Sequence, residues 1–125
     1  MLAIDHRCFG ERNYVSESAA AKLALWQGTS LWALMLRDAL AAGAWLRARD
    51  DIDPARVAVV GMSMGAFLAH WHAALDPLVT ACVDCCGLLD YDALIADGGL
   101  DRHGIYAYVP GLLARFSALD VNALI

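Results

Sequence analysis

The stretch DPARVAVVGMSMGA, residues 53–66, decides the fold of this chain. Pro54 fixes its own backbone and disfavours helix in Asp53, so a new element is expected to begin after them. The run VAVV at 57–60 is apolar without alternation, as in a parallel strand that is covered on both faces. A turn flanked by glycines comes next and leads into another apolar run. This order predicts a buried strand, a sharp turn and a helix.

Ser63 lies at the centre of the turn, in the pentapeptide Gly61-Met62-Ser63-Met64-Gly65. Between a strand and a helix, Gly-x-Ser-x-Gly holds the serine in a strained backbone conformation with its hydroxyl exposed. A residue without a side chain is expected at positions 61 and 65 because neighbouring chain passes close to them. The backbone N–H of Met64 could face an oxygen that becomes negative during acyl transfer. The motif predicts a nucleophile at Ser63, with an ordinary strand-to-helix turn as the alternative.

Further from the turn, helical and extended patterns alternate. Thr29 or Ser30 can cap a helix that runs to about residue 48 and should lie against a sheet. A second helix is expected at 65–75, and the apolar run at 78–86 predicts another buried strand after it. This order is typical of an α/β domain with a mostly parallel sheet and flanking helices.

The two ends of the chain carry weaker patterns. Residues 2–4 are expected to be only the tail of a strand. Beyond Gly87 the chain is rich in loops, with short helices predicted at about 91–96 and 112–119, and this C-terminal part is interpreted as a lid-like segment over one end of the sheet. Six aromatic residues could line an acyl or aryl pocket or pack this segment onto the sheet: Trp26, Trp32, Tyr91, Tyr106, Tyr108 and Phe116.

A family resemblance rests on three of these segments. Residues 53–66 resemble the nucleophile elbow of the α/β-hydrolase superfamily, in its dienelactone-hydrolase-like and acetyl-esterase-like branch. Residues 3–11 are similar to the end of the strand before the first helix in that branch, and residues 74–81 to the end of the elbow helix and the next strand. The resemblance implies a partial α/β-hydrolase fold with Ser63 as nucleophile and the Met64 N–H as an oxyanion donor.

The resemblance also implies an acid and a histidine on loops that follow later strands. Less than half of the chain follows Ser63, and the strands that would precede Asp5 are absent. Residues 1–125 are therefore expected to be a single incomplete domain of a longer parent chain, without the N-terminal strands and without the C-terminal acid and histidine region. Alone, the chain is expected to be inactive.

Resident side chains are weaker alternatives for the missing groups. His70 and His72 lie in the helix that leads away from Ser63, so both are interpreted as packing or surface groups. His103 could fold over the site from the loop-rich segment, and His6 could border it. Three carboxylates near the end of the second strand could supply a displaced acid: Asp84, with Asp90 and Asp92 after it.

Composition excludes several classes of protein. A net charge of −5 and the lack of a basic stripe argue against nucleic-acid binding. Of the four cysteines, Cys82, Cys85 and Cys86 crowd into an apolar segment and are interpreted as buried thiols, with a zinc site as a minor alternative. No phosphate loop or dinucleotide motif occurs, so no cofactor and no metal are expected. The apolar stretch at 57–75 is interpreted as strand, turn and helix rather than a membrane span, and without a signal peptide a cytoplasmic location is expected.

These patterns favour a serine hydrolase that acts on a small carboxylic ester through an acyl-enzyme on Ser63. One alternative is a serine peptidase of the same fold, because the same elbow serves both reactions. The other is a non-catalytic α/β fragment that only binds a partner. Strand edges left open by an incomplete sheet would favour self-association.

Overall fold

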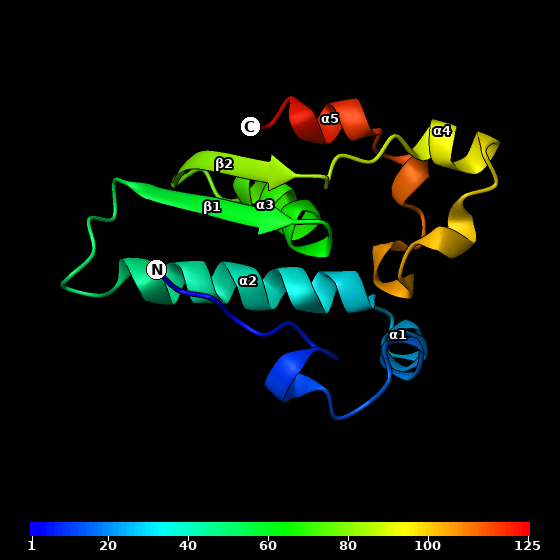
Figure 1. Ribbon diagram of the computed structural model, residues 1–125, viewed down its shortest axis with the longest axis horizontal. Coiled ribbons are helices and arrows are strands. Elements are labelled where there is room, and N and C mark those ends of the chain that lie inside the picture. The colour runs from blue at the N-terminus through cyan, green and yellow to red at the C-terminus, as the bar shows by residue number, and fades with distance from the viewer.

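The computed structural model describes residues 1–125, which fold into helices around a small parallel sheet (Figure 1). In chain order the elements are η1 (Gly10–Arg12), α1 (Glu17–Trp26), α2 (Leu31–Arg47), β1 (Val57–Met62), α3 (Met64–Leu75), β2 (Val79–Cys85), α4 (Tyr91–Ala96), η2 (Leu100–Arg102), η3 (Ile105–Ala107), η4 (Leu112–Ala114) and α5 (Ala118–Asn122). The predicted order of strand, helix and parallel strand is confirmed.

The two strands lie side by side and run in the same direction (Figure 1). Their register aligns Val60 with Val83 and Met62 with Cys85. Both strands end on the side of the molecule where α1 and α4 lie (Figure 1). The turn after β1 and the turn after β2 therefore meet at one edge of the sheet, as in other parallel sheets.

Only one face of the sheet is covered, and the expectation of strands buried on both faces is wrong. Helix α3 packs on both strands and buries Val57. Side chains on the other face stand open to solvent, with Val60 exposed to 69% and Met62 to 76%. A continuous apolar run identifies a strand but does not tell which of its faces has a partner. Both strands also have one free edge each, the surfaces on which the expected self-association would act.

The hydrophobic core lies between the helices rather than on the sheet. Ser30 caps α2, as predicted, by accepting the N–H of Ala33 at 3.1 Å. Helix α2 packs mainly against α3, and it also borders β1, because residues of both elements line one groove. One cluster of eight buried residues joins α1, α2 and α3: Cys8, Ala21, Leu31, Trp32, Met35, Leu36, Phe67 and Leu68.

Helix α1, which the sequence patterns above do not predict, anchors the C-terminal segment. Ser16 caps this helix by accepting the N–H of Ala19. The Glu17 carboxylate then accepts the backbone N–H of Tyr106 in η3 at 3.2 Å. The C-terminal segment therefore rests on helices, and α4 lies at the end of the sheet where both strands finish, as the lid-like interpretation expected (Figure 1).

The helix expected at 112–119 is divided. Residues 112–114 form the turn η4, and a new helix begins only after Ser117. Ser117 and Asp120 form a capping box, in which each side chain binds the backbone N–H of the other residue. A cap of this kind starts a helix, which is why the chain cannot continue helically through this point.

The N-terminal residues run beside α2 without joining the sheet. Residues 2–4 have no strand assignment, so the prediction of a strand tail there is wrong. Asp38 of α2 holds the following loop, since its carboxylate accepts Nε of Arg7 and Nη2 of Arg12, each at 2.8 Å. These ion pairs fix the loop on the helix instead of placing the preceding residues against β1. None of the helices combines the length and the apolar character needed to cross a bilayer.

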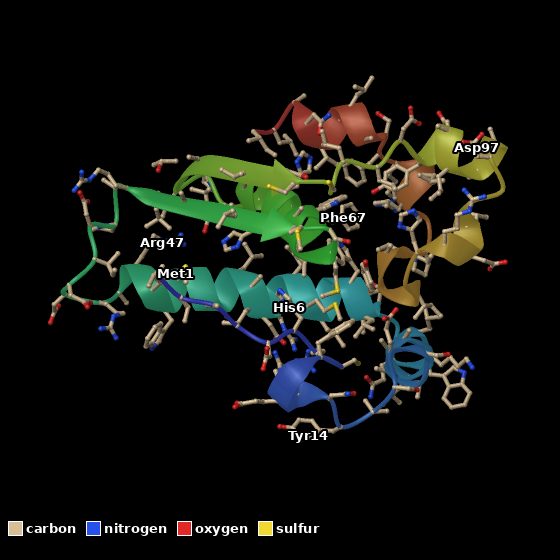
Figure 2. The ribbon with its side chains drawn as sticks, viewed as in Figure 1. Met1, His6, Tyr14, Arg47, Phe67 and Asp97 are labelled. Atoms are coloured by element: carbon tan, nitrogen blue, oxygen red, sulfur yellow. The ribbon has the colours of Figure 1, made fainter.

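A buried ionic cluster joins the C-terminal ends of α2 and α3. Arg47 Nη2 lies 2.7 Å from Asp76 Oδ2, and both side chains are largely buried. Asp76 also accepts the backbone N–H of Leu78 at 3.1 Å. His72 Nε2 lies 3.4 Å from the same carboxylate, with its ring against Gly43. The cluster lies at the end of α2 that is remote from Phe67 and the turn after β1 (Figure 2).

Asp76→Ala is expected to lower the free energy of unfolding by about 3 kcal/mol. The substitution leaves the Arg47 guanidinium buried without a partner, which typically costs several kcal/mol. Urea denaturation followed by circular dichroism measures the loss. Asp51→Ala is the matched control, because it breaks an exposed Arg49–Asp51 ion pair and should leave the midpoint unchanged. Equal midpoints for the two variants would contradict a structural role of the buried pair.

The stability of the chain is expected to fall in two stages on acidification. Burial lowers the pKa of His72, so below about pH 6.5 the unfolded chain takes up a proton that the folded chain refuses. Burial opposes ionisation of Asp76, but the Leu78 N–H and the Arg47 guanidinium outweigh it and lower the Asp76 pKa. A second loss is therefore expected below about pH 4, where the unfolded carboxyl is protonated first.

Urea midpoints at pH 8, 6.5 and 5 measure the first stage. His72→Gln should reduce the fall in midpoint over this range. Some fall should remain, because burial also lowers the pKa of His6. An unchanged slope in His72→Gln would show that His72 does not couple folding to pH.

Candidate functional site

Ser63 occupies the turn between β1 and α3, at the carboxyl end of the sheet. Its backbone has φ 53° and ψ −119°, a conformation that residues other than glycine rarely adopt. Two hydrogen bonds hold this conformation: the Ser63 N–H donates to the Cys85 carbonyl at 2.9 Å, and the Ser63 carbonyl accepts the Phe67 N–H at 3.0 Å. Figure 2 shows Phe67 beside the end of β1. The strained turn that the motif predicts is present.

The Ser63 hydroxyl is exposed and makes no hydrogen bond. This distinguishes it from the serines that begin the other helices. Ser16, Ser30 and Ser117 each accept a backbone N–H of their own helix with the side-chain oxygen. Ser63 stands at the same N-cap position of α3 but has no such bond. Its oxygen is therefore free to react with a ligand from solvent.

Gly61 and Gly65 differ in the space around their Cα atoms. A Cβ atom on Gly61 would collide with the carbonyl group of Gly65, so the turn closes only around a bare Cα. At Gly65 itself nothing lies within 4 Å of an added Cβ, and the expectation of a close approach there is wrong. The reason is that Gly65 faces the free edge of β1, in a groove lined also by residues 57–60.

Gly87 is a third glycine of the site, and the sequence analysis missed it. A Cβ atom there would collide with the backbone of Ala66 and Phe67, in the first turn of α3. The chain leaving β2 therefore passes directly against the start of the elbow helix. A glycine just after the strand that follows the elbow is the signal that could have identified it.

The first amides of α3 point out of the helix at the position of Ser63. The N–H of Met64 is the first of these, and no residue one helical turn earlier can accept it. Partial positive charge at a helix N-terminus favours a negative ligand group. The structure thus places a free hydroxyl beside the positive end of a 12-residue helix.

Each of the two histidines of α3 lies near an acid, and neither is hydrogen-bonded to Ser63. His70 Nδ1 lies 3.7 Å from Asp84 Oδ2. Asp84 also accepts the Gly87 N–H with Oδ1 at 2.6 Å, which fixes the turn after β2. Asp84 therefore acts as a turn-forming group beside His70, and the structure does not support its role as a displaced acid. His72 belongs to the Asp76 cluster described above, so its interpretation as a packing group is correct.

The remaining candidates are also separate from the turn. His6 lies beside α2 (Figure 2), where burial, followed in size by the charge of Arg12, lowers its pKa. His103 is exposed between η2 and η3. Asp90 caps α4 by accepting the Ala93 N–H at 3.0 Å, and Asp92 is exposed in the first turn of that helix. No side chain hydrogen-bonds to the Ser63 hydroxyl.

The cysteines are free thiols, and the interpretation of the clustered ones as buried is wrong. Cys8 is buried, Cys82 is half-buried, and Cys85 and Cys86 are exposed. Cys82 and Cys85 point to opposite faces of β2, because side chains alternate along a strand. A shared zinc ion is therefore excluded by geometry for this pair, and no group of three or more His, Cys, Asp or Glu side chains converges to hold a metal.

An aromatic stack fixes the C-terminal segment on the helices. The ring of Trp32 stacks on Phe67 at 4.4 Å between centroids and on Tyr106 at 6.0 Å. Tyr91 and Tyr108 line an apolar cavity of about 480 Å³ between α1, α4 and the segment that follows. Ser63 is not among the residues that line this cavity. Of the other predicted aromatic residues, Trp26 is 90% exposed and Phe116 is 45% exposed.

Gly61→Ala and Gly65→Ala are expected to have opposite effects on stability. Gly61→Ala should destabilise the chain by about 3 kcal/mol, because the added methyl meets backbone that cannot move aside. Gly65→Ala should stabilise it by up to about 1 kcal/mol, because alanine is the better helix former and the site is open. Urea denaturation of the two variants gives the comparison. A Gly61→Ala chain as stable as the parent would contradict the close approach.

Comparison with known proteins agrees with this geometry. Residues 9–102 match the Dienelactone hydrolase family. The chain is 44% identical over all of its 125 residues to "Putative hydrolase YtaP" of Bacillus subtilis (strain 168), and it spans 42% of the length of that relative. No solved structure matches the chain significantly. With the hydrolase elbow at Ser63 and a family match over most of its length, the chain belongs to the dienelactone hydrolase family.

Proposed function

We propose that Ser63 is the nucleophile of a hydrolase that cleaves a small carboxylic ester, and that this chain supplies the nucleophile region of a longer parent protein. The observation that carries the proposal is the exposed, unbonded hydroxyl of Ser63 at the start of α3. Membership of a hydrolase family supports hydrolysis as the reaction. The ester substrate and the acyl-enzyme belong to the proposal.

The proposed reaction has two stages. The Ser63 oxygen attacks the ester carbonyl while a base removes the hydroxyl proton, and the tetrahedral intermediate then expels the alcohol, which takes that proton. Water attacks the acyl-serine in the same way, releasing the carboxylic acid and restoring the Ser63 hydroxyl. The strained backbone of Ser63 holds the oxygen away from its own helix throughout.

Stabilisation of the tetrahedral oxyanion is assigned to the Met64 N–H. This amide lacks a partner in its own helix and lies directly after the nucleophile. One donor of this kind is worth about 3 kcal/mol of barrier in comparable sites. The charge at the N-terminus of α3 acts in the same direction.

The base and the acid that orients it are assigned to other parts of the parent protein. The two histidines of α3 contact Asp84 and Asp76, and His6 packs beside α2. None of these rings is hydrogen-bonded to Ser63. The similarity to a relative that is more than twice as long is consistent with this assignment.

One observation favours a second candidate function. Because no histidine is hydrogen-bonded to Ser63, the chain could instead be a non-catalytic α/β module that only binds a partner. Such a module would keep the fold and the exposed serine without an activated oxygen. The two functions differ in the reactivity of Ser63.

Labelling by a fluorophosphonate probe is expected to depend on Ser63 and to be lost in both Ser63→Ala and Ser63→Gly. The two variants should differ in stability, because glycine relieves the positive φ that alanine retains. Ser63→Gly should exceed Ser63→Ala by about 1 kcal/mol in free energy of unfolding. In-gel fluorescence and urea denaturation measure the two effects.

The labelling is carried out on this chain and on the longest chain that the gene encodes. Labelling confined to the longer chain would agree with a base outside residues 1–125, and cleavage of p-nitrophenyl acetate by that chain would test the ester. A longer chain that is folded but unlabelled would exclude the nucleophile role and leave the non-catalytic module.

A further inference from the structure

Two adjacent cysteines lie beside Ser63 at the same end of the sheet. Cys85 of β2 is the register partner of Met62 of β1. Cys86 and Ser63, the next residues of the two chains, therefore occupy equivalent positions after their strands. The backbones are joined directly, because the Cys85 carbonyl accepts the Ser63 N–H at 2.9 Å. Neighbouring strands lie about 4.8 Å apart, so Ser63 and Cys86 begin from neighbouring positions of the sheet edge.

Cys86 and Ser63 share a positive φ at the ends of the two strands. Cys86 has φ 66° and Ser63 has φ 53°, and the one other non-glycine residue with positive φ is Cys8. Gly87 pins the chain after Cys86 against the first turn of α3. The backbone that follows the thiol pair is therefore held against the same helix N-terminus at which Ser63 stands.

The thiols at this turn differ from the other two in their access to solvent. Cys85 and Cys86 are both exposed, whereas Cys8 is buried and Cys82 is half-buried on the covered face of β2. Burial also raises the pKa of Cys8 and of Cys82, which lowers their share of reactive thiolate. Reagents from solvent should reach the pair first.

We propose that Cys85 and Cys86 form a thiol-exchange site that small disulfides modify, and that this modification closes access to Ser63. The effect on catalysis rests on the proposed function of Ser63, whereas the thiol chemistry does not. A thiol of the pair loses its proton to solvent, and its sulfur attacks one sulfur of the disulfide RSSR. The protein–S–SR bond forms, the RS–SR bond breaks, and RS⁻ leaves; the protein sulfur is oxidised and the departing sulfur is reduced. A free thiol such as dithiothreitol reverses the step.

Closure follows from where the added group would stand. A group the size of glutathione attached at Cys86 would cover the neighbouring position, from which the Ser63 hydroxyl projects. It would also disturb the turn at Cys86, directly after the Cys85 carbonyl that accepts the Ser63 N–H. Two independent effects are therefore expected: slower reaction of Ser63 with reagents and faster hydrogen exchange of its amide.

Thiol counting with Ellman's reagent on the folded chain tests the site. Two thiols should react rapidly and two slowly. The double variant Cys85→Ser/Cys86→Ser should lose the rapid phase, and the matched control Cys8→Ser/Cys82→Ser should keep it. Peptide mass spectrometry after treatment with oxidised glutathione should find the adduct on residue 85 or 86. A rapid phase that persists in the first variant would overturn the proposal.

Two readouts then test closure. In the glutathione adduct, hydrogen exchange of the Ser63 amide should be at least tenfold faster. If the unmodified chain reacts with the fluorophosphonate, the adduct should react at least tenfold more slowly. Dithiothreitol should restore both rates. If the unmodified chain never labels, the role of Ser63 is in question, while amide exchange still decides the effect of the thiol site. An adduct that changes neither labelling nor exchange would overturn the proposed closure.

Discussion

The contact between Gly61 and the backbone of Gly65 is the constraint on which the rest of the site depends. Because Gly61 has no side chain, the chain can leave β1 and enter α3 within a single residue. That reversal places Ser63 at a helix N-cap with a positive φ, where its side chain does not reach back to the helix. In a longer turn the serine could cap α3 as Ser30 caps α2. Its hydroxyl oxygen would then accept a backbone N–H of the helix.

The strained turn is held by its neighbours rather than by its own preference. Hydrogen bonds from Ser63 to Cys85 and from Phe67 to Ser63 fix the residue on both sides. Phe67 stacks on Trp32, which belongs to the core between the helices. The unfavourable φ is thus maintained from two sides, by the β2 carbonyl of Cys85 and by α3, which is packed through Phe67 into the core between the helices. The conformation of the turn therefore depends on these few contacts.

Local patterns predicted the elbow, but they could not show what surrounds it. The strand, the turn and α3 follow from short-range rules on apolar runs, glycine and caps, and they are confirmed in the structure. Whether a face is covered depends on residues distant in sequence. Local patterns therefore could not predict that Val60 and Cys85 are exposed, or that α2 packs on α3. Gly65 shows the same limit, because its place in the motif gives no information on which atoms lie beside it.

The distribution of ionisable groups explains why one hydroxyl is available while the histidines are not. Asp76 and Asp84 each combine a backbone N–H with a neighbouring histidine, so both acids stabilise the ends of elements next to α3. His70 and His72 lie near these acids along α3, whereas Ser63 is at the start of the helix. A base that reaches the hydroxyl must approach from the open carboxyl end of the sheet, where the exposed thiols of Cys85 and Cys86 also lie. On the two proposals made above, access to this one edge would govern both the activation of Ser63 and its obstruction.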